Sequence, residues 1–429
     1  MSAFSLLQSY LEQTIKSGRL TLIDANGNTH SFGSDDGDDN DGETRRVTVE
    51  ITKPSLYWRL VMMPDPAAGE AFMDGNLKIH KGTIFDLFAI LADQPDLKRR
   101  SRWNRINLAK LEGFKPNRIG RAQKNVAHHY DLNRQLFELF LDEDLQYSCA
   151  YFQSHGVSLD QAQLAKKQHI AAKLALQPGM KVLDIGSGFG GMAIYLAETC
   201  DVDVTGVTLS EEQFKLAQEK CAERGLQDRV TFKLLDYREL DQKFDRIVSV
   251  GMFEHVGAQH YSEFFNKVSD LLTDDGVALI HTIGRMHGPV ETSRWITKYI
   301  FPGGHIPALS EVAPVVEKVG LIMSDHEVLR LHYALTLREW RNRFMKNRKR
   351  AQLLYDERFC RMWEFYLASS EASFRFHDLV IFQIQLSKNL NTLPLTRDYM
   401  HLEETRLADH YPKLQHAEGK QKRRAKSSK

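Results

Sequence analysis

Apolar and polar residues follow a regular order through the middle of the chain. Short apolar runs, typical of buried strands, alternate with longer segments in which apolar residues recur every three or four positions, as on one face of a helix. Strands that alternate with helices favour a parallel sheet covered on both faces, the doubly wound α/β class. The predicted strands are 181–185, 203–207, 230–234, 244–250, 277–282, 322–331 and 379–386, and the predicted helices are 133–141, 159–174, 192–198, 211–224 and 261–272.

The first 120 residues follow a different pattern. Apolar residues at helical spacing predict helices over residues 2–16 and 84–92, and the turn pair Asn26-Gly27 lies among segments with an extended pattern. We therefore expect a smaller N-terminal α+β domain over residues 1–120, which docks or binds because it contains no catalytic constellation. The expected extended segments are 20–24, 46–51 and 56–63, and a linker is expected over 98–121.

The remaining organisation follows from composition. Hydrophobic residues make up 42% and charged residues 26% of 429, which is ordinary for a globular protein. We expect a catalytic domain over 121–395 and a C-terminal extension over 396–429. The four cysteines show no CxxC spacing, which argues against a zinc site or a disulfide framework and favours a cytoplasmic protein. With no signal-peptide pattern and no apolar run near ~20 residues, we expect no membrane span.

Charge is strongly segregated although the formal net charge is only +1. Residues 35–43 carry six acids and are predicted to form a loop, and residues 341–350 carry six bases. A further six bases lie in residues 419–429, a tail predicted to be disordered. Trp340, Phe344 and Met345 accompany the second run, a mixture that suits anionic lipid or nucleic acid. We favour an anionic membrane surface and expect no nucleic acid partner.

The segment KVLDIGSGFGG (181–191) carries the clearest chemistry. Apolar residues lead into Asp184, and then Gly186, Ser187, Gly188 and Gly190 form a turn before a helical pattern resumes. A strand, a glycine turn and a helix present bare backbone to a nucleotide-like ligand at the carboxyl edge of a sheet. The absence of a following Lys excludes a Walker-type loop, and the spacing differs from GxGxxG. The pattern fits S-adenosylmethionine (SAM), whose carboxylate the helix dipole favours.

The ends of the next two strands extend this cofactor site. Thr208-Leu209 and Gln213 stand where many nucleotide sites place an acid for the ribose hydroxyls. Asp236 is expected to accept from the adenine amino group, with Tyr237 beside the ring; Asp236 could equally cap a helix. Asp184 is expected to orient the glycine turn and to accept from the ammonium group of SAM.

The fourth and fifth strands contribute a second constellation. Glu254, His255 and His281 follow neighbouring strands, and titratable groups brought together beside a cofactor turn indicate function. Each could alternatively be a satisfied structural residue or a helix cap. Their spacing matches no metal-ligand motif, so we expect no metal.

Several separated motifs together resemble the cyclopropane fatty acid synthases, which include the mycobacterial mycolic acid cyclopropane synthases. They are HHYDLNRQLFELFLDEDLQYSCAYF (128–152), DIGSGFGG, GVTLSEEQ, DYREL, GMFEHVG, HTIG, WITKYIFPGGHIPALSEV and HYALTLREW, in the family's order over residues 126–390. The resemblance implies the class I SAM-dependent methyltransferase fold, which is Rossmann-like. It also implies transfer of a SAM methyl group to a cis double bond of a phospholipid acyl chain, through a cation that loses a proton and closes to a ring.

The resemblance also implies particular residue roles. Bound bicarbonate would be the base, held by the Cys149 backbone, Glu254, His281, the Ile283 backbone and Tyr333. Tyr147 and Ser148 would contact SAM. For the cation, Phe152, Phe253 and Tyr299 are expected to supply π faces.

Three other functions fit part of the pattern. A related enzyme could methylate the same alkene and leave a methyl or methylene branch, and another methyltransferase could act on a soluble amine or oxygen. A non-catalytic lipid-binding protein could keep the SAM fold. The resemblance further suggests a homodimer that works on the inner face of the membrane.

Overall fold

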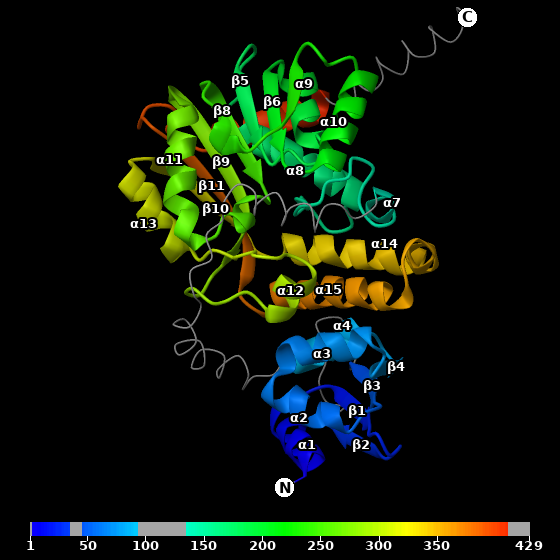
Figure 1. Cartoon of the computed structure of the whole chain (residues 1–429). Helices are drawn as coiled ribbons and strands as arrows, with labels where there is room; N and C mark the ends of the chain where they lie inside the picture. Colours follow the sequence, from blue (N-terminus) through cyan, green and yellow to red (C-terminus); the bar gives the residue numbers. More distant parts are fainter. Residues whose placement is uncertain (1, 35–44, 93–133, 411–429) are drawn as a thin grey trace, which may run out of the picture.

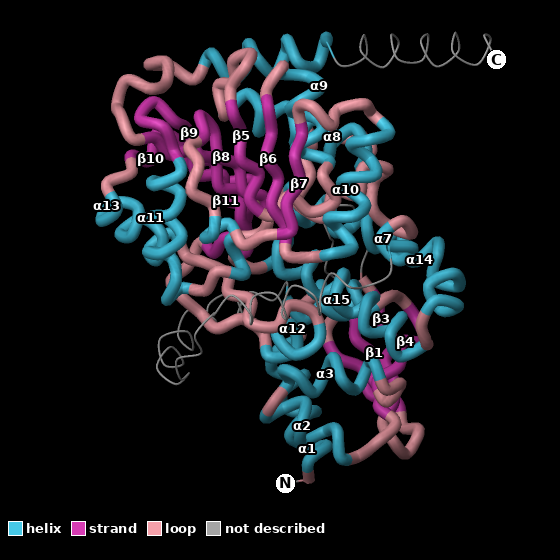
Figure 2. Tube along the Cα trace, turned by 45° about the horizontal axis from the view of Figure 1, so that its top comes forward, coloured by secondary structure: helices cyan, strands magenta, loops and turns pink. Residues whose placement is uncertain are grey.

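A seven-stranded sheet forms the centre of the larger unit of the computed structural model, which describes residues 2–34, 45–92 and 134–410 (Figures 1 and 2). The strand order is β10-β11-β9-β8-β5-β6-β7. The doubly wound α/β prediction is confirmed, except that β11 runs antiparallel to both of its neighbours. The strands are β5 (Lys181–Ile185), β6 (Asp203–Thr208), β7 (Val230–Leu234), β8 (Phe244–Val250), β9 (Leu272–Arg285), β10 (Ile322–Leu329) and β11 (Leu379–Ser387).

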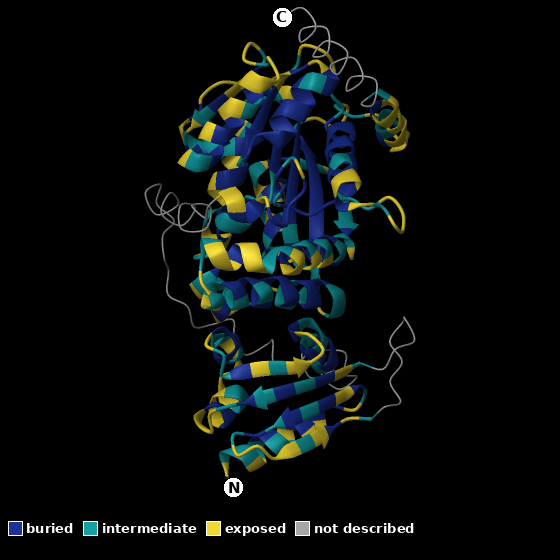
Figure 3. Cartoon of the chain, turned by 90° about the vertical axis from the view of Figure 1, so that its right-hand side faces the viewer, coloured by how far each residue is buried: buried dark blue, intermediate teal, exposed yellow. Residues whose placement is uncertain are grey.

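Helices cover both faces of this sheet. One apolar core joins the strands to α11 and α13, and a second core joins them to α8, α9 and α10 on the opposite face. Figure 3 shows the strands as the most deeply buried part of this unit. The helices are α7 (Arg134–Phe137), α8 (Leu159–Lys173), α9 (Gly191–Cys200), α10 (Glu211–Glu223), α11 (Tyr261–Leu271), α12 (Arg294–Tyr299) and α13 (Leu309–Val319), with 3-10 turns η1 (Tyr237–Glu239), η2 (Phe253–His255) and η3 (Ala258–His260).

A long helical hairpin separates the sheet from the N-terminal unit (Figure 1). Helices α14 (His332–Leu354) and α15 (Glu357–Phe376) stand in the chain between β10 and β11 and pack along each other. Helix α15 is capped by Asp356, whose carboxylate accepts from the Phe359 N–H at 2.7 Å. Phe365 of α15 contacts Phe88 of the N-terminal unit, with ring centroids 5.1 Å apart. The apolar core of the N-terminal unit is therefore continuous with that of the hairpin.

The N-terminal unit is α+β, as predicted, with a four-stranded sheet in the order β2-β1-β3-β4. The extended structure predicted for 56–63 is wrong, because this segment forms α2. Its apolar residues follow helical spacing, and the buried pair Leu56 and Tyr57 faces the core. The elements are α1 (Ala3–Thr14), β1 (Arg19–Ile23), β2 (Thr29–Phe32), β3 (Arg46–Ile51), α2 (Ser55–Met62), α3 (Pro64–Met73), β4 (Leu77–Lys81) and α4 (Ile84–Ala92).

Other segments differ from the prediction or lie beyond the description. The helix predicted over 133–141 is only the short α7, and the strand predicted over 277–282 is the longer β9. Residues 398–410 are helical, and Leu407 within them is fully buried. The acidic segment 35–43, the linker 98–121 and the tail 419–429 lie outside the described residues. Within the described ranges, no helix is long and apolar enough to cross a bilayer.

Candidate active site

The glycine turn after β5 borders a cavity of about 160 Å³. Gly186 has φ +79°, and a Cβ there would lie 2.8 Å from the Met252 Cβ, so the turn requires glycine. At Gly188, with φ +53°, a Cβ would meet no protein atom within 4 Å, because the backbone faces open space. The turn therefore presents uncovered main chain to the cavity, as predicted.

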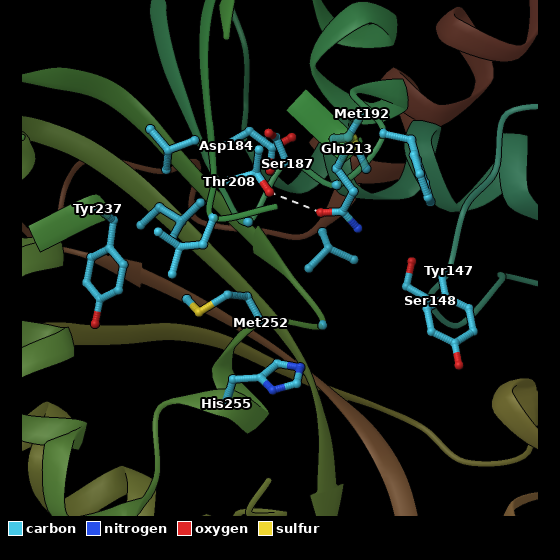
Figure 4. Close-up of a pocket in the computed structure, with 18 of the residues that line it drawn as sticks. Tyr147, Ser148, Asp184, Ser187, Met192, Thr208, Gln213, Tyr237, Met252 and His255 are labelled. Carbon is cyan, nitrogen blue, oxygen red and sulfur yellow. Dashed lines mark hydrogen bonds between the residues drawn. The ribbon is translucent and has the colours of Figure 1, made fainter. Parts of the chain in front are cut away.

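The structure brings the predicted cofactor-binding residues together around this cavity (Figure 4). Only Gly190 does not line it; this residue, with φ +82°, is the N-cap of α9 behind the turn. The glycine turn and the end of β6 form one side, and the segment before α8 forms another. The predicted residues in the wall are Tyr147, Ser148, Asp184, Gly186, Ser187, Gly188, Thr208, Leu209, Gln213, Asp236 and Tyr237.

Two polar atoms of the wall are enclosed and, among the described residues, have no hydrogen-bond partner: Asp184 Oδ2 and Ser187 Oγ. Burial raises the pKa of Asp184 to about 7, and the Lys166 charge opposes this only in part. A carboxyl in this condition gains most from a cationic ligand. The wall thus fits the ammonium group of SAM, which Asp184 was predicted to bind.

The ribose and adenine residues are held by local contacts. The Thr208 hydroxyl donates to Gln213 Oε1 at 3.0 Å, which fixes both side chains at the end of β6. Asp236 accepts from the Arg238 N–H at 3.0 Å and from Arg238 Nη2 at 2.7 Å. Asp236 is therefore the cap of η1 and an ion-pair partner as well as a wall residue. Its contact with adenine stays a prediction.

Lys166 is a cofactor-side residue that the sequence analysis missed. Its side chain is fully buried, and Nζ donates to Gln146 Oε1 at 2.6 Å and to Ser148 Oγ at 2.8 Å. Both acceptors belong to residues of the cavity wall. Burial lowers the pKa of Lys166 to about 8, against the opposing effect of Asp142. A buried positive charge thus lies directly behind the wall of the first cavity.

A second cavity, of about 70 Å³, adjoins the first. Its wall contains all five residues predicted to hold the base: Cys149, Glu254, His281, Ile283 and Tyr333. Tyr147, Ser148, Gly251 and His255 line both cavities. The two predicted halves of the site therefore share one wall.

Glu254 and His281 point unsatisfied polar atoms into enclosed space. Glu254, in η2, accepts from the Ile283 N–H through Oε1 at 2.6 Å, whereas its Oε2 has no partner among the described residues. Burial raises the pKa of Glu254 to about 7. His281 contacts Gln383 Nε2 through Nδ1 at 3.1 Å, and its Nε2 has no partner in the described chain. Burial, and then the nearby Lys166 charge, hold the pKa of His281 well below its usual value, so the ring is neutral.

The other base-site residues are fixed by packing. Burial raises the pKa of the Cys149 thiol, and Sγ donates to the Ala150 carbonyl at 3.3 Å, so a thiolate nucleophile is disfavoured. The Ala150 N–H donates to Thr336 Oγ1 of α14 at 3.0 Å. Tyr333 packs edge-on against Trp340, with ring centroids 5.7 Å apart. The start of α14 therefore holds both Tyr333 and the backbone beside Cys149. Direct ligation of an anion by Ile283 stays a prediction, because its N–H holds Glu254.

The aromatic residues predicted to face the cation do not line the second cavity. Phe253 is fully buried in the core beneath η2, and Phe152 and Tyr299 are absent from the wall. Aromatic side chains at the cavity come instead from Tyr147, Phe301 and Tyr333. The described residues contain no group of three or more His, Cys, Asp or Glu side chains placed to hold a metal ion.

The basic run 341–350 is largely part of the fold. Trp340 and Phe344 are fully buried in the hairpin, so they do not accompany the bases on the surface. Arg341 pairs with Glu371 at 2.9 Å, and Arg348 pairs with Glu357 at 2.8 Å. The aromatic part of the lipid-docking prediction for this run is therefore wrong. Lys346, Lys349 and Arg350 remain exposed.

Comparison with known proteins covers this whole region. A family model described as mycolic acid cyclopropane synthetase matches residues 117–384, which include every residue lining either cavity. The cyclopropane-fatty-acyl-phospholipid synthase of Escherichia coli (strain K12) is 38% identical over 342 residues, or 80% of this chain and 88% of that protein. A probable fatty acid methyltransferase of Pseudomonas putida is 34% identical over 382 residues, or 84% of this chain and 93% of that protein. The crystal structure of mycolic acid cyclopropane synthase CmaA1 with SAH and CTAB is 34% identical, with a TM-score of 0.59, over 64% of this chain and 99% of its own.

Proposed function

Because this chain belongs to the mycolic acid cyclopropane synthetase family and is a SAM-dependent methyltransferase, we propose that it is a cyclopropane-fatty-acyl-phospholipid synthase. In this role it adds a methylene group across a cis double bond of an unsaturated phospholipid acyl chain. The observation that carries the proposal is the shared wall between the SAM cavity and a smaller cavity with unsatisfied polar atoms from Glu254 and His281.

The residues of the first cavity fit SAM, which supplies an electrophilic methyl group when bound. Asp184 accepts from the ammonium group, and the bare backbone at Gly188 admits the ligand to the turn. Ser148, backed by the Lys166 charge, favours the carboxylate. Because an alkene is a poor nucleophile, close in-line placement in a dry site must supply much of the rate.

The residues of the second cavity fit bicarbonate, which supplies a small base when bound. A neutral His281 with a proton on Nε2 donates to an anionic oxygen, and the Tyr333 hydroxyl can donate to another. Glu254 Oε2 is an acceptor for the one O–H of bicarbonate. Bicarbonate offers anionic oxygens to the two donors, His281 and Tyr333, and an O–H group to the acceptor, Glu254. The aromatic rings at this cavity stabilise a nearby cation.

Apolar residues complete the second cavity. Ile296, Phe301, Ile306 and Ile381 line it, which suits an acyl chain. Helix α12, which carries Ile296, is capped by the N-terminal unit: Asp65 accepts from the N–H groups of Arg294 and Trp295, each at 2.8 Å. The N-terminal unit thus supports one wall of the proposed lipid site.

We place the membrane contact mainly on α2 of the N-terminal unit. Trp58, Met62 and Met63 are 51%, 56% and 55% exposed; Trp58 and Met62 lie about one turn apart on α2, and Met63 follows as its C-cap. An aromatic and two flexible apolar side chains in water, beside exposed Lys53, suit the interface of an anionic bilayer on the inner face of the membrane. The bases Lys346, Lys349 and Arg350 would add electrostatic attraction.

Vesicle co-sedimentation tests this contact. A triple change of Trp58, Met62 and Met63 to Ser should reduce binding to anionic vesicles, whereas Leu395→Ser, at a fully exposed apolar residue elsewhere, should not. Changing the three exposed bases to Gln should lower binding mainly at low salt. Binding that ignores salt and all of these changes would contradict the proposal. The homodimer stays a prediction from the resemblance, which sedimentation of the purified chain would test.

The activity itself is tested by the lipids of a host that expresses the chain. We expect unsaturated acyl chains to gain one CH₂ and to show cyclopropane proton resonances. Glu254→Gln should abolish this gain while SAH binding persists, and Glu219→Gln, an exposed charge change, should leave it intact. Full turnover by Glu254→Gln would refute the assignment of this residue.

The same experiment separates the competing functions. The Pseudomonas putida relative is named a fatty acid methyltransferase, so a methyl or methylene branch is the second candidate product. A gain of one CH₂ without ring resonances would establish that product. Activity on a soluble acceptor without vesicles would favour a small-molecule methyltransferase. SAH and lipid binding without any product would favour a non-catalytic lipid-binding protein.

A further inference from the structure

His281 belongs to a row of polar residues that crosses three strands. Gln383 of β11 lies directly opposite His281 of β9, and Glu327 of β10 lies opposite Gln383. Residues that face each other in neighbouring strands point to the same side of the sheet. Here that side is covered by α8, from which Lys173 reaches the row. Gln383 is fully buried, and its amide lies between the lysine and the histidine.

The chemistry of the neighbours dictates how the Gln383 amide is turned. Lys173 Nζ lies 2.7 Å from Gln383 Oε1 and also donates to Glu327. An ammonium group can only donate, so the atom that faces it must be the amide oxygen. The NH₂ group then has to face His281, whose Nδ1 lies 3.1 Å from Nε2. This orientation satisfies both contacts, whereas the flipped amide would set its NH₂ group against the lysine ammonium group, where two donors meet and no hydrogen bond can form.

We propose that Gln383 is a positioning residue that holds His281 in the Nε2–H tautomer, and that Lys173 in turn holds Gln383. An Nδ1 atom that accepts a hydrogen bond carries no proton, so in a neutral ring the proton is on Nε2. His281 lines the second cavity, and its Nε2 has no partner in the described chain. The inference rests on the proposed function in one respect: a donor at Nε2 is useful because the ligand there is an anion such as bicarbonate.

The row continues away from the cavity through alternating charges. Glu327 Oε2 accepts from His169 at 2.7 Å, and the other nitrogen of His169 contacts Glu404 in the helical segment 398–410. Burial lowers the pKa of His169, but the two carboxylates more than offset this and raise it overall. Against burial, His169 and Lys173 lower the pKa of Glu327 to about 2. Lys173 therefore has a fixed anionic partner that anchors it beneath Gln383.

The row orients His281 but does not conduct protons from it. A primary amide neither takes up nor releases a proton readily at neutral pH. Gln383 therefore blocks proton transfer between His281 and Lys173. The contribution of Gln383 is geometric: it sets the ring angle and the tautomer. Partners that orient metal-bound histidines typically contribute about 10- to 100-fold in affinity or activity, and we expect an effect of the same order here.

The tautomer can be measured directly by NMR on protein labelled with ¹⁵N-histidine, with His281 assigned through His281→Gln. The wild type should show the Nε2–H form. Gln383→Glu places a carboxylate against Nδ1, so the proton should move to Nδ1 or the ring should become doubly protonated. Gln383→Leu should leave a mixture of tautomers. An Nδ1–H ring in the wild type, or one unchanged tautomer in both variants, would overturn the proposal.

Kinetics supply a second measurement with a matched control. Gln385, two residues along β11, is equally buried and donates to the Lys173 carbonyl at 2.5 Å and to Tyr399 at 2.7 Å. Gln385→Leu therefore removes comparable buried hydrogen bonds without touching His281. Gln383→Leu should raise the bicarbonate concentration needed for half-maximal rate by about 10- to 100-fold with SAH affinity unchanged, and Gln385→Leu should not. Equal effects of the two changes would reduce Gln383 to a structural residue.

The two measurements keep this inference separate from the proposed function. If the wild-type rate does not respond to bicarbonate, the proposed base is wrong, yet the NMR result still decides whether Gln383 sets the tautomer. If the rate responds to bicarbonate and the tautomer does not respond to Gln383, the positioning role alone is refuted.

Discussion

Replacing Glu254 by Gln should stabilise the ligand-free protein at neutral and alkaline pH. The carboxyl is enclosed on its Oε2 side, and burial raises its pKa from 4.5 to about 7. The folded state therefore resists ionisation of this group. A glutamine has the same shape, keeps an oxygen for the Ile283 N–H, and cannot ionise. The change that removes the proposed acceptor thus also removes a cost of folding.

The size and the pH window follow from linkage. Below about pH 4.5 the carboxyl is neutral in both states and costs nothing. Between about 4.5 and 7 the unfolded chain releases its proton first, so stability falls as pH rises. A rise from 4.5 to about 7 corresponds to about 3 kcal/mol at 1.36 kcal/mol per pKa unit, reached fully above pH 7. At roughly 2–4 °C per kcal/mol, the midpoint of Glu254→Gln should lie several degrees above that of the wild type.

Thermal unfolding from pH 4.5 to 8.5, in buffer freed of bicarbonate and SAM, measures this difference. The two midpoints should converge at low pH and separate as pH rises. Glu311→Gln is the control of opposite sign, because His305 and the Ala308 N–H overcome burial and lower the pKa of Glu311. It should destabilise the protein by a nearly constant amount across this range, because the stabilising effect of this carboxylate is lost only below about pH 4.5. Parallel wild-type and Glu254→Gln profiles would show that burial does not penalise this carboxylate.

Two further predictions concern the cofactor side, and a third concerns the base site. Gly186→Ala should weaken SAH binding by more than about 10-fold in calorimetry, because the new Cβ would press on Met252. Gly179→Ala is the control: Gly179 has a similar φ of +80°, but a Cβ there would meet no protein atom within 4 Å, so the change should cost only about 1–2 kcal/mol of stability. Wild-type SAH affinity should fall as pH rises through about 8, where Lys166 loses its charge, and Lys166→Met should bind about 10-fold more weakly and lack this pH dependence. Cys149→Ala should keep most of its activity in the lipid assay, since only its backbone is proposed to act; loss of activity with intact folding would contradict this.

The cofactor site was predictable from the sequence because its information is local. In the parallel part of the sheet, the residues of the candidate cofactor site stand in the few positions that follow each strand. Asp184 and the glycines stand within one short segment, and Thr208 and Asp236 follow the next two strands. An α/β sheet gathers such segments at one edge, so their proximity needs no knowledge of long-range pairing. The resemblance then added the residues proposed to hold the base, and the structure gathers them around one cavity.

The helical hairpin was not predicted, although its periodicity is present. Tyr333, Leu337, Trp340 and Phe344 recur at intervals of three and four, and all are buried. The bases between them favour a surface role, and together with the aromatic residues they predict a lipid-binding surface instead of a buried helix face. The sequence does not show which arginines pair with carboxylates of distant segments, as Arg341 does with Glu371. The charge of a segment therefore does not predict whether it forms a binding surface until its ion-pair partners are known.

Lys166 and Lys173 are a signal in the sequence that could have predicted a buried polar site. With Leu159, Gln163 and Ile170 they occupy the spacing of one buried helical face, where lysine is rare unless paired. That anomaly marks a buried polar site, but the identity of its partners depends on strand register. Shifting β11 by one residue against β9 would turn Gln383 to the other face of the sheet, away from His281. Because β11 is the one antiparallel strand and follows a hairpin of two helices, no local rule sets its register. The contact proposed to order the base site therefore becomes visible only in the folded sheet.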